Sequence, residues 1–179
     1  MVSTDRDRAE AVLEDVLTTS ARDLLRYLES RIGPDDAPDA LSDVLVTAWR
    51  RISDLPTDGR DARLWLFGIA RNTILNVRRG NLRRSNLAHQ LHRHADREHH
   101  DGADAGIEVR DAIDRLDPDL AELVRTIHWD GFTLAEAARL LEIPASTAAS
   151  RYRRAARLLR EALVPVTSLH ASTRAGRTT

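Results

Sequence analysis

Apolar residues recur every three or four positions along almost the whole of this 179-residue sequence, and this spacing restricts the possible folds more than any other feature. Such spacing places apolar side chains on one side of an α-helix. No segment has the sustained alternation, rich in β-branched and aromatic residues, that indicates a strand. The sequence therefore predicts an all-α protein.

Glycine and proline divide this pattern into separate helices. Turn signals stand at Gly33-Pro34, Pro56–Gly59, Asp130-Gly131 and Ile143-Pro144. We predict helices over the ranges 5–17, 20–32, 36–53, 62–82, 107–115, 118–129, 133–141 and 145–163. The first four helices are expected to form one small domain, residues 1–84, and the last four a second, residues 107–163.

Two segments are expected to lie outside these domains. Residues 85–106 are polar, contain the run Asp101–Gly106 and have no apolar stripe to bury, which is typical of a flexible linker. Residues 164–179 have the composition of a disordered tail.

Composition and missing motifs exclude several classes of protein. The sequence has no cysteine, which excludes disulfide frameworks, thiolate zinc sites and cysteine nucleophiles. It has no signal-peptide core and no apolar stretch of about 20 residues, so we expect a cytoplasmic protein without a membrane segment. No phosphate-binding loop, catalytic triad or metalloprotease motif is present. We expect neither enzymatic activity nor a cofactor.

Charge is strongly segregated along the chain, although the net charge is only −1. Residues 60–94 carry 8 Arg against 1 acid, and residues 145–163 carry 5 Arg against 1 acid. Residues 1–58 and 103–142 are acidic, each with a net charge of −6. Two basic blocks on an otherwise acidic chain predict two localised contacts with a polyanion.

The second basic block belongs to a predicted helix-turn-helix. A short helix, 133–141, is followed by a three-residue turn and the longer basic helix 145–163. The predicted packing stripe of the longer helix contains Ala148, Tyr152, Ala155, Leu159 and Ala162. Hydroxyls and guanidinium groups gather elsewhere on the helix, where they suit the major groove of DNA. We assign duplex contacts to Ser146, Thr147, Ser150, Arg151, Arg153, Arg154 and Arg157.

The alternative for this basic helix is a solvated charged face. Its arginines have almost no acidic partner one helical turn away, with Glu161 the main exception, whereas exposed structural helices usually mix their charges. This pattern favours an anion as the partner.

The first basic block also has an apolar and a polar side. Its predicted core residues are Leu66, Phe67, Ile69, Ala70, Ile74 and Val77. The polar side combines an aromatic ring with amides, which can stack on and hydrogen-bond unpaired bases, and continues as a stripe of arginines for phosphates. We assign single-strand contacts to Trp65, Arg71, Asn72, Asn76, Arg78, Arg79, Arg83 and Arg84. The alternative for Trp65 alone is a cap on the domain core.

The predicted helix 36–53 has an outward face with charges of both signs and a valine. Its predicted buried stripe contains Leu41, Val44, Leu45, Ala48, Trp49 and Ile52. The outward residues are Asp39, Asp43, Val46 and Arg50. Such a face suits protein docking, while surface aspartates that only increase solubility are the alternative.

Histidines are concentrated in the predicted linker and allow a metal-binding or pH-sensing hypothesis. They are His89, His92, His94, His99 and His100. No carboxylate-supported fixed geometry is evident around them, which favours a plain linker.

Two stretches of the sequence together resemble the short sigma factors of the extracytoplasmic-function (ECF) group in the sigma-70 superfamily. The run Asp39–Trp49 resembles the family's acidic-aliphatic run ending in Trp, and Trp65–Asn72 resembles its "WLfrIARN" stretch. Residues Leu116–Leu163 resemble the promoter-binding helical unit, including Gly131–Ala138 and Ser146–Arg151. The second stretch alone is also similar to helix-turn-helix domains of response regulators, but the order and spacing of the two are specific to sigma factors.

The resemblance implies a subunit that binds core RNA polymerase and recognises promoters. It implies that the Asp39/Asp43 face docks on the β′ clamp coiled coil, which replaces the solubilising interpretation, and that the β flap is a further contact. It also implies that Asn72 and Asn76, with the loop 56–62, hold a flipped base of the melted minus-ten element. The second domain would recognise the minus-thirty-five element as duplex, and an anti-sigma factor would be a further partner.

Several residues depart from the family pattern. Pro38 and Ser42 replace the usual Glu and Gln around the docking motif, Ala149 stands where Lys or Arg is common, and Gly68 replaces a frequent Arg. Loss of a cation at position 149 removes a base or phosphate contact, so the promoter sequence is left open.

Two other functions remain as alternatives. A stand-alone helix-turn-helix regulator would use only residues 107–163 and bind duplex DNA without polymerase. A protein-interaction or metal-storage module would instead use the histidines of the linker.

Overall fold

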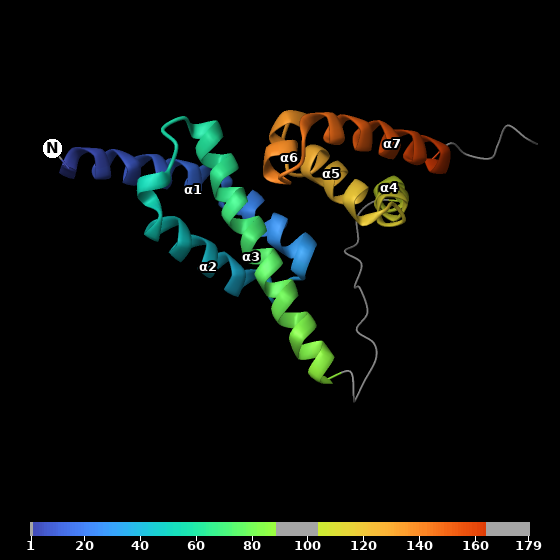
Figure 1. Ribbon diagram of the computed structural model, residues 1–179, viewed down its shortest axis with the longest axis horizontal. Helices are drawn as coiled ribbons and strands as arrows, with labels where there is room; N and C mark the ends of the chain where they lie inside the picture. The colour runs from blue at the N-terminus through green and yellow to red at the C-terminus, as the bar shows by residue number, and fades with distance from the viewer. Residues whose placement is uncertain (1, 89–103, 164–179) are drawn as a thin grey trace, which may run out of the picture. The chain divides into compact units, whose positions relative to one another are not determined.

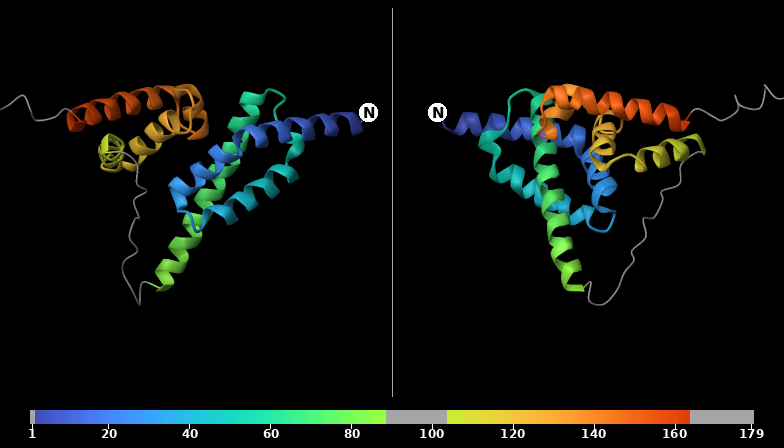
Figure 2. Two further views of the ribbon diagram at one scale, coloured as in Figure 1. Left: turned by 180° about the vertical axis from the view of Figure 1, so that it is seen from behind. Right: turned by 45° about the vertical axis from the view of Figure 1, so that its right-hand side comes forward.

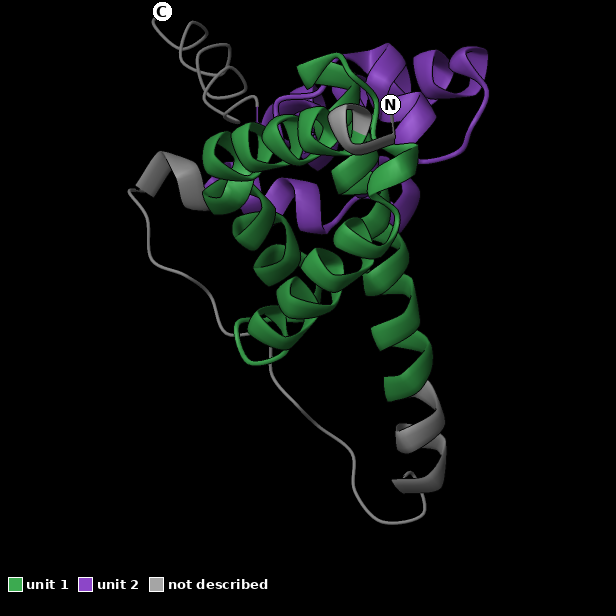
Figure 3. Cartoon of the chain, turned by 90° about the vertical axis from the view of Figure 1, so that its left-hand side faces the viewer, with its two compact units in different colours: residues 1–96 green, residues 97–179 purple. Residues whose placement is uncertain are grey.

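The computed structural model describes residues 2–88 and 104–163, with side chains for residues 6–81 and 108–163. The described residues form helices and short turns and contain no strand, which confirms the predicted all-α class. The chain divides into two compact units, Met1–Asp96 and Arg97–Thr179 (Figure 3). Most of the predicted linker and the whole predicted tail lie outside the described residues.

The first unit contains three α-helices that all pack against one another (Figures 1 and 2). They are α1 (Val2–Ile32), α2 (Ala37–Arg50) and α3 (Gly59–Ala88), and a short 3-10 helix η1 (Ile52–Asp54) follows α2. The last turns of α3 project beyond α1 and α2 in each view (Figures 1 and 2). Helix α3 therefore extends past residue 84, into the predicted linker.

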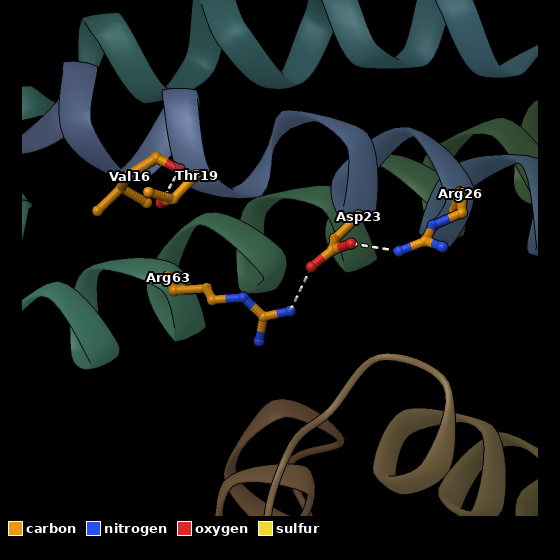
Figure 4. Close-up of polar contacts among 5 residues, drawn as sticks. All are labelled: Val16, Thr19, Asp23, Arg26 and Arg63. Atoms are coloured by element: carbon orange, nitrogen blue, oxygen red, sulfur yellow. Dashed lines mark hydrogen bonds and ion pairs between the residues drawn. The ribbon is translucent and has the colours of Figure 1, made fainter.

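The predicted break between residues 17 and 20 is wrong, because α1 is continuous through this region. Thr18 and Thr19 donate their hydroxyls to the carbonyls of Glu14 and Asp15, at 2.8 and 2.9 Å. Thr19 also bonds the carbonyl of Val16 at 3.2 Å (Figure 4). Hydroxyls satisfied by the preceding turn are compatible with a helix interior.

A pair of aromatic rings and an ion pair join α1 to α3, and each ring also carries an arginine of its own helix. The fully buried rings of Tyr27 and Phe67 meet edge to face, with centroids 5.1 Å apart. The Arg31 guanidinium lies 3.7 Å from the Tyr27 centroid, and that of Arg63 lies 4.6 Å from the Phe67 centroid. Arg63 also reaches Asp23 at 3.5 Å (Figure 4). This packing fixes the helix that carries the predicted single-strand contacts.

The second unit contains α4 (Asp104–Asp114), α5 (Pro118–His128), α6 (Leu134–Leu140) and α7 (Ala145–Leu163). Helix α7 packs against the other three. One apolar cluster joins α4, α5 and α7, and another joins α5, α6 and α7 through Leu123, Ala137, Ala138 and Ala148. Leu158 and Leu159 are the last α7 residues packed into the core, so the prediction that Ala162 belongs to the packing stripe is wrong.

The helix-turn-helix corner is fixed by caps at both ends of α6. Thr133 and Glu136 form a reciprocal capping box at its start. At its end, the amide of Ile143 donates to Ala138 O at 3.0 Å and that of Glu142 to Arg139 O at 3.2 Å. These two bonds define a Schellman motif, which puts its C′ residue in the left-handed region. Here that residue is Glu142, with φ of 56°.

A glycine at position 142 should therefore stabilise the second unit. The left-handed conformation costs an L-residue roughly 1–2 kcal/mol, part of which is offset by the greater chain entropy of glycine in the unfolded state. We expect Glu142→Gly to raise the free energy of unfolding by about 0.5–1 kcal/mol. Urea unfolding of the wild type and variant measures this change; a destabilised variant would contradict the account of the turn.

Candidate nucleic-acid and protein-binding surfaces

Helix α7 presents hydroxyls and guanidinium groups on its outward side. Ser146, Ser150, Arg153 and Arg157 are exposed, whereas Thr147 and Ala149 are half-buried. The Ser150 hydroxyl donates to Thr147 O at 2.9 Å, and Arg153 Nε donates to Ala149 O at 3.2 Å. These internal bonds leave the remaining guanidinium donors of Arg153 directed to the surface of the helix.

Two further arginines of α7 form ion pairs with the start of α5. Arg151 lies 2.6 Å from Asp119, and Arg154 lies 3.2 Å from Asp117. The prediction that the arginines of this helix lack acidic partners holds along the helix, apart from Arg157 and Glu161 at 4.0 Å. That pattern says nothing of partners on other helices, and α5 supplies two carboxylates that are far away in the sequence.

The polar side of α3 keeps its amides exposed. Asn72 and Asn76 are exposed and Trp65 is half-buried, as is Arg71. Arg79 donates to Asn76 Oδ1 at 2.8 Å and to Leu75 O at 3.1 Å. Because a guanidinium can only donate, Asn76 must turn its oxygen toward Arg79 and keep its own N–H donors for another partner.

The opposite side of α3 forms the core of the first unit. Leu66, Phe67, Ile69, Ala70 and Ile74 are buried, which confirms these predictions. Val77 is only half-buried, and Leu64, which the helical pattern did not select, is 6% exposed.

Arg78 is exposed, and one of its nitrogens also contacts the protein itself. Its terminal nitrogen donates to the carbonyl of Arg31 at 3.1 Å, in the last turn of α1. The last carbonyls of a helix have no partner within it, and arginine commonly satisfies them. Arg83 and Arg84 lie in the final turns of α3, where side chains are outside the described residues.

Arg78 and Arg79 should therefore respond differently to truncation. We expect Arg78→Ala to lower the free energy of unfolding by about 1 kcal/mol, because a cationic cap of α1 is lost. Arg79→Ala, its neighbour on the exposed surface, should change stability by about 0.5 kcal/mol or less. Thermal unfolding of the two variants measures these changes. Equal losses of stability in Arg78→Ala and Arg79→Ala would contradict the capping role of Arg78.

Helix α2 exposes more apolar surface than the sequence predicted. Leu45 is 39% exposed and Trp49 is 52% exposed, so their assignment to the buried stripe is wrong. The buried side of α2 consists instead of Ala37, Ala40, Val44 and Ala48. Small alanines allow close approach of the other helices, and the larger side chains remain at the edge of the contact.

These apolar residues lie beside the predicted acidic row. Asp39, Asp43 and Arg50 are exposed, and Val46 is 48% exposed. At 3.6 residues per turn, the apolar row and the charged row occupy adjoining arcs of one helix. We call this surface the α2 docking face; it consists of Asp39, Asp43, Leu45, Val46, Trp49 and Arg50.

The two departures near this face have local structural roles. Pro38 stands in the first turn of α2, where its missing N–H is tolerated. The Ser42 hydroxyl donates to Pro38 O at 3.1 Å. Both residues therefore support the start of the helix that carries the docking face.

Among the described residues, no group of three or more His, Asp or Glu side chains is arranged to hold a metal ion. The five histidines of the predicted linker lie outside the described residues. In the described part of the chain, no helix combines the length and apolar character needed to cross a membrane.

Both units match domains of one known family. Residues 17–84 match the family model of sigma-70 region 2, and residues 107–159 match that of sigma-70 region 4. The chain belongs to the sigma-70 family. This sigma-family chain is also 28% identical over 159 residues to the ECF RNA polymerase sigma factor SigL of Mycobacterium tuberculosis. The similarity covers 85% of this chain and 89% of that protein and supports membership of the ECF group.

Solved structures of sigma factors share the fold. The sigma factor RpoE from Bartonella quintana, solved with the anti-sigma factor NepR, has a TM-score of 0.69 and 25% identity. The match covers 84% of this sigma-family chain and 95% of that one. CnrH, solved with the cytosolic domain of CnrY, has a TM-score of 0.59 and 21% identity, over 88% and 95% of the two chains. The predicted pair of sigma-type helical domains is confirmed.

Proposed function

We propose that the chain directs promoter-specific transcription initiation as a subunit of RNA polymerase. In this proposal it binds core polymerase, recognises duplex DNA at the minus-thirty-five element and captures melted DNA at the minus-ten element. The main support for this proposal is the α2 docking face. This exposed apolar and acidic surface suits a protein partner, which a regulator that only binds DNA through the second unit would not need.

The α2 docking face suits a partner with an apolar centre and a basic rim. Leu45, Val46 and Trp49 supply exposed apolar surface, and large aromatic side chains commonly dominate binding energy at protein interfaces. Asp39 and Asp43 supply charges for orientation and rapid association. The partner proposed for this face is the clamp coiled coil of the β′ subunit.

The polar side of α3 suits unpaired bases. Asn72 and Asn76 offer hydrogen bonds to base edges, and the partly exposed ring of Trp65 offers stacking. Flipping a base out of the duplex costs a few kcal/mol, which such contacts must offset. With residues 56–62, which form the turn before α3 and its first residues, these side chains are proposed to hold a base of the melted minus-ten element. Arg71, Arg78, Arg79, Arg83 and Arg84 are proposed to bind its phosphates.

The outward side of α7 suits a major groove. Ser146, Thr147, Ser150, Arg153 and Arg157 are the proposed contacts to bases and phosphates of the minus-thirty-five duplex. The same unit is proposed to contact the β flap of the polymerase. Arg151 and Arg154 lie on the same helix but are engaged by carboxylates of α5.

An anti-sigma factor is the proposed regulatory partner. The similar RpoE was solved in complex with the anti-sigma factor NepR. Exposed apolar surface on α2 must be covered when polymerase is not bound, or it favours aggregation. A partner that covers this surface would also prevent polymerase binding.

Transcript profiling after overexpression tests this function. The genes induced should share one two-part promoter motif, and their induction should be lost with Asp43→Arg, which reverses a charge on the α2 docking face. A stand-alone regulator that uses only the second unit would keep its activity in this variant. Induction that survives Asp43→Arg would therefore reject the sigma-factor proposal.

A further inference from the structure

Two carboxylates at the start of α5 hold two arginines of α7. Asp119 Oδ2 lies 2.6 Å from a terminal nitrogen of Arg151, and Asp117 Oδ2 lies 3.2 Å from one of Arg154. These four residues line an open depression of about 510 Å³ together with Ser150, Pro118 and Leu120. Ser150 also belongs to the outward side of α7, so the ion pairs adjoin the proposed DNA face.

Helix capping does not explain the position of the Asp117 side chain. Asp117 is the N-cap residue of α5, where an aspartate ordinarily accepts a hydrogen bond from an amide of the first turn. Its side chain makes no such bond in α5 and instead pairs with Arg154 on α7. The Asp117 carboxylate therefore binds a residue of another helix, α7, instead of capping its own helix, α5.

The ion pairs change which cations α7 can offer to DNA. The Arg151 side chain is only 32% exposed and Asp119 is 67% exposed, so the carboxylate stands on the solvent side of the pair. Arg154 and Asp117 are both largely exposed. A phosphate that approaches either arginine competes with a carboxylate for the guanidinium donors or lies close to its negative charge. Salt screens this repulsion between carboxylate and phosphate only weakly, because the two groups would lie within one Debye length, about 10 Å at 0.1 M salt.

We propose that Asp117 and Asp119 are specificity-determining residues, which hold Arg154 and Arg151 in ion pairs and so weaken binding to duplexes of arbitrary sequence. The inference rests on the proposed duplex-binding role of α7. Phosphate contacts supply affinity for every sequence alike, and a released arginine can find a phosphate in any register. At a promoter, contacts from the outward side of α7 already set the register, so released arginines would add less there. The carboxylates thus increase the difference between the affinity of the chain for promoter DNA and its affinity for other DNA.

Binding of the full chain to a short fluorescein-labelled duplex of mixed sequence tests this inference. By fluorescence anisotropy, Asp119→Asn should bind about 3- to 10-fold more tightly than the wild type. The dependence of log K on log salt should become steeper by about 0.9 for each additional phosphate that the variant binds. Asp114→Asn is the matched control, because it also removes one charge and frees one arginine, Arg125 of α5, without touching α7. The control should change affinity about twofold or less.

A second substitution separates release of Arg151 from a general charge effect. If Asp119 acts by holding Arg151, the increase in affinity should disappear in Asp119→Asn/Arg151→Ala, measured relative to Arg151→Ala alone. Circular dichroism melts establish that each variant is folded, since exposed ion pairs contribute little to stability. An increase that persists without Arg151, or an Asp119→Asn affinity no higher than that of the control, overturns the inference.

Arg153→Ala distinguishes failure of this inference from failure of the proposed function. This residue is exposed on the outward side of α7 and has no role in the two ion pairs. Weaker binding of Arg153→Ala supports α7 as the duplex-binding helix, whatever the result for Asp119. Unchanged binding of Arg153→Ala would count against α7 as the duplex-binding helix, which is the premise of this inference. The proposed polymerase docking through α2 would still be tested separately by Asp43→Arg.

Discussion

Trp49→Ala should lower the affinity of the chain for core RNA polymerase by about 30- to 1,000-fold, or about 2–4 kcal/mol. Exposed tryptophans at the centre of an interface commonly contribute this much when a partner buries them. Trp49 is 52% exposed on α2 and stands beside Leu45 and Val46, so its truncation removes most of the apolar centre of the docking face. Thermal unfolding should change little, because the side chain packs only partly in the free chain.

The second unit supplies a matched control for this prediction. Trp129 is 46% exposed, almost the same as Trp49, but it lies at the end of α5 and outside the α2 docking face. Titration of labelled polymerase with each variant compares the two tryptophans directly. Equal losses of affinity for Trp49→Ala and Trp129→Ala would contradict the assignment of α2 as the main docking element.

Phe67→Ala should destabilise the first unit by about 3–5 kcal/mol, which is a large part of the stability of a small domain. The ring is fully buried, meets Tyr27 at 5.1 Å and carries the Arg63 guanidinium at 4.6 Å. Its removal leaves a cavity between α1 and α3 and takes away an aromatic and a cation–π contact at once.

Tryptophan fluorescence can follow this loss in the first unit alone. In a Trp129→Phe background, the remaining tryptophans, Trp49 and Trp65, both lie in the first unit. Urea unfolding of Phe67→Ala should then show a midpoint far below that of the parent. Trp65 lies on the same helix but is half-buried, so Trp65→Ala should lower the urea midpoint by less than Phe67→Ala. A Phe67→Ala midpoint close to the parent would show that the Tyr27–Phe67 contact is not central to this core.

The sequence predicted the parts of the fold that depend on spacing within one helix. The core side of α3, from Leu66 to Ile74, and the buried residues Ala148 and Ala155 of α7 follow directly from the helical repeat. In the predicted stripe of α2, Val44 and Ala48 are buried as expected, but Leu45 and Trp49 are not. The helix has two apolar arcs, and only its neighbours decide which of them is buried. Packing through alanines selected the arc of Ala40, Val44 and Ala48 and left Leu45 and Trp49 exposed.

Contacts between helices could not be predicted from the sequence for a similar reason. Arg151 and Asp119 are 32 residues apart, and Arg78 and Arg31 are 47 residues apart, so no local pattern links either pair. The arginines predicted for DNA therefore include some that the protein itself engages. The outward side of α7 and the exposed amides of α3 were nonetheless correctly placed on accessible surfaces, because exposure follows from the same repeat that defines the core.

In vitro transcription with purified core polymerase tests the central claim most directly. Core enzyme alone should give no start-site-specific product from templates carrying the promoters of the induced genes. Addition of the chain should give transcripts with one defined 5′ end on each template, and Asp43→Arg should abolish them. Absence of any start-site-specific transcript from core enzyme plus the wild-type chain would contradict the claim that this protein is a promoter-recognition subunit.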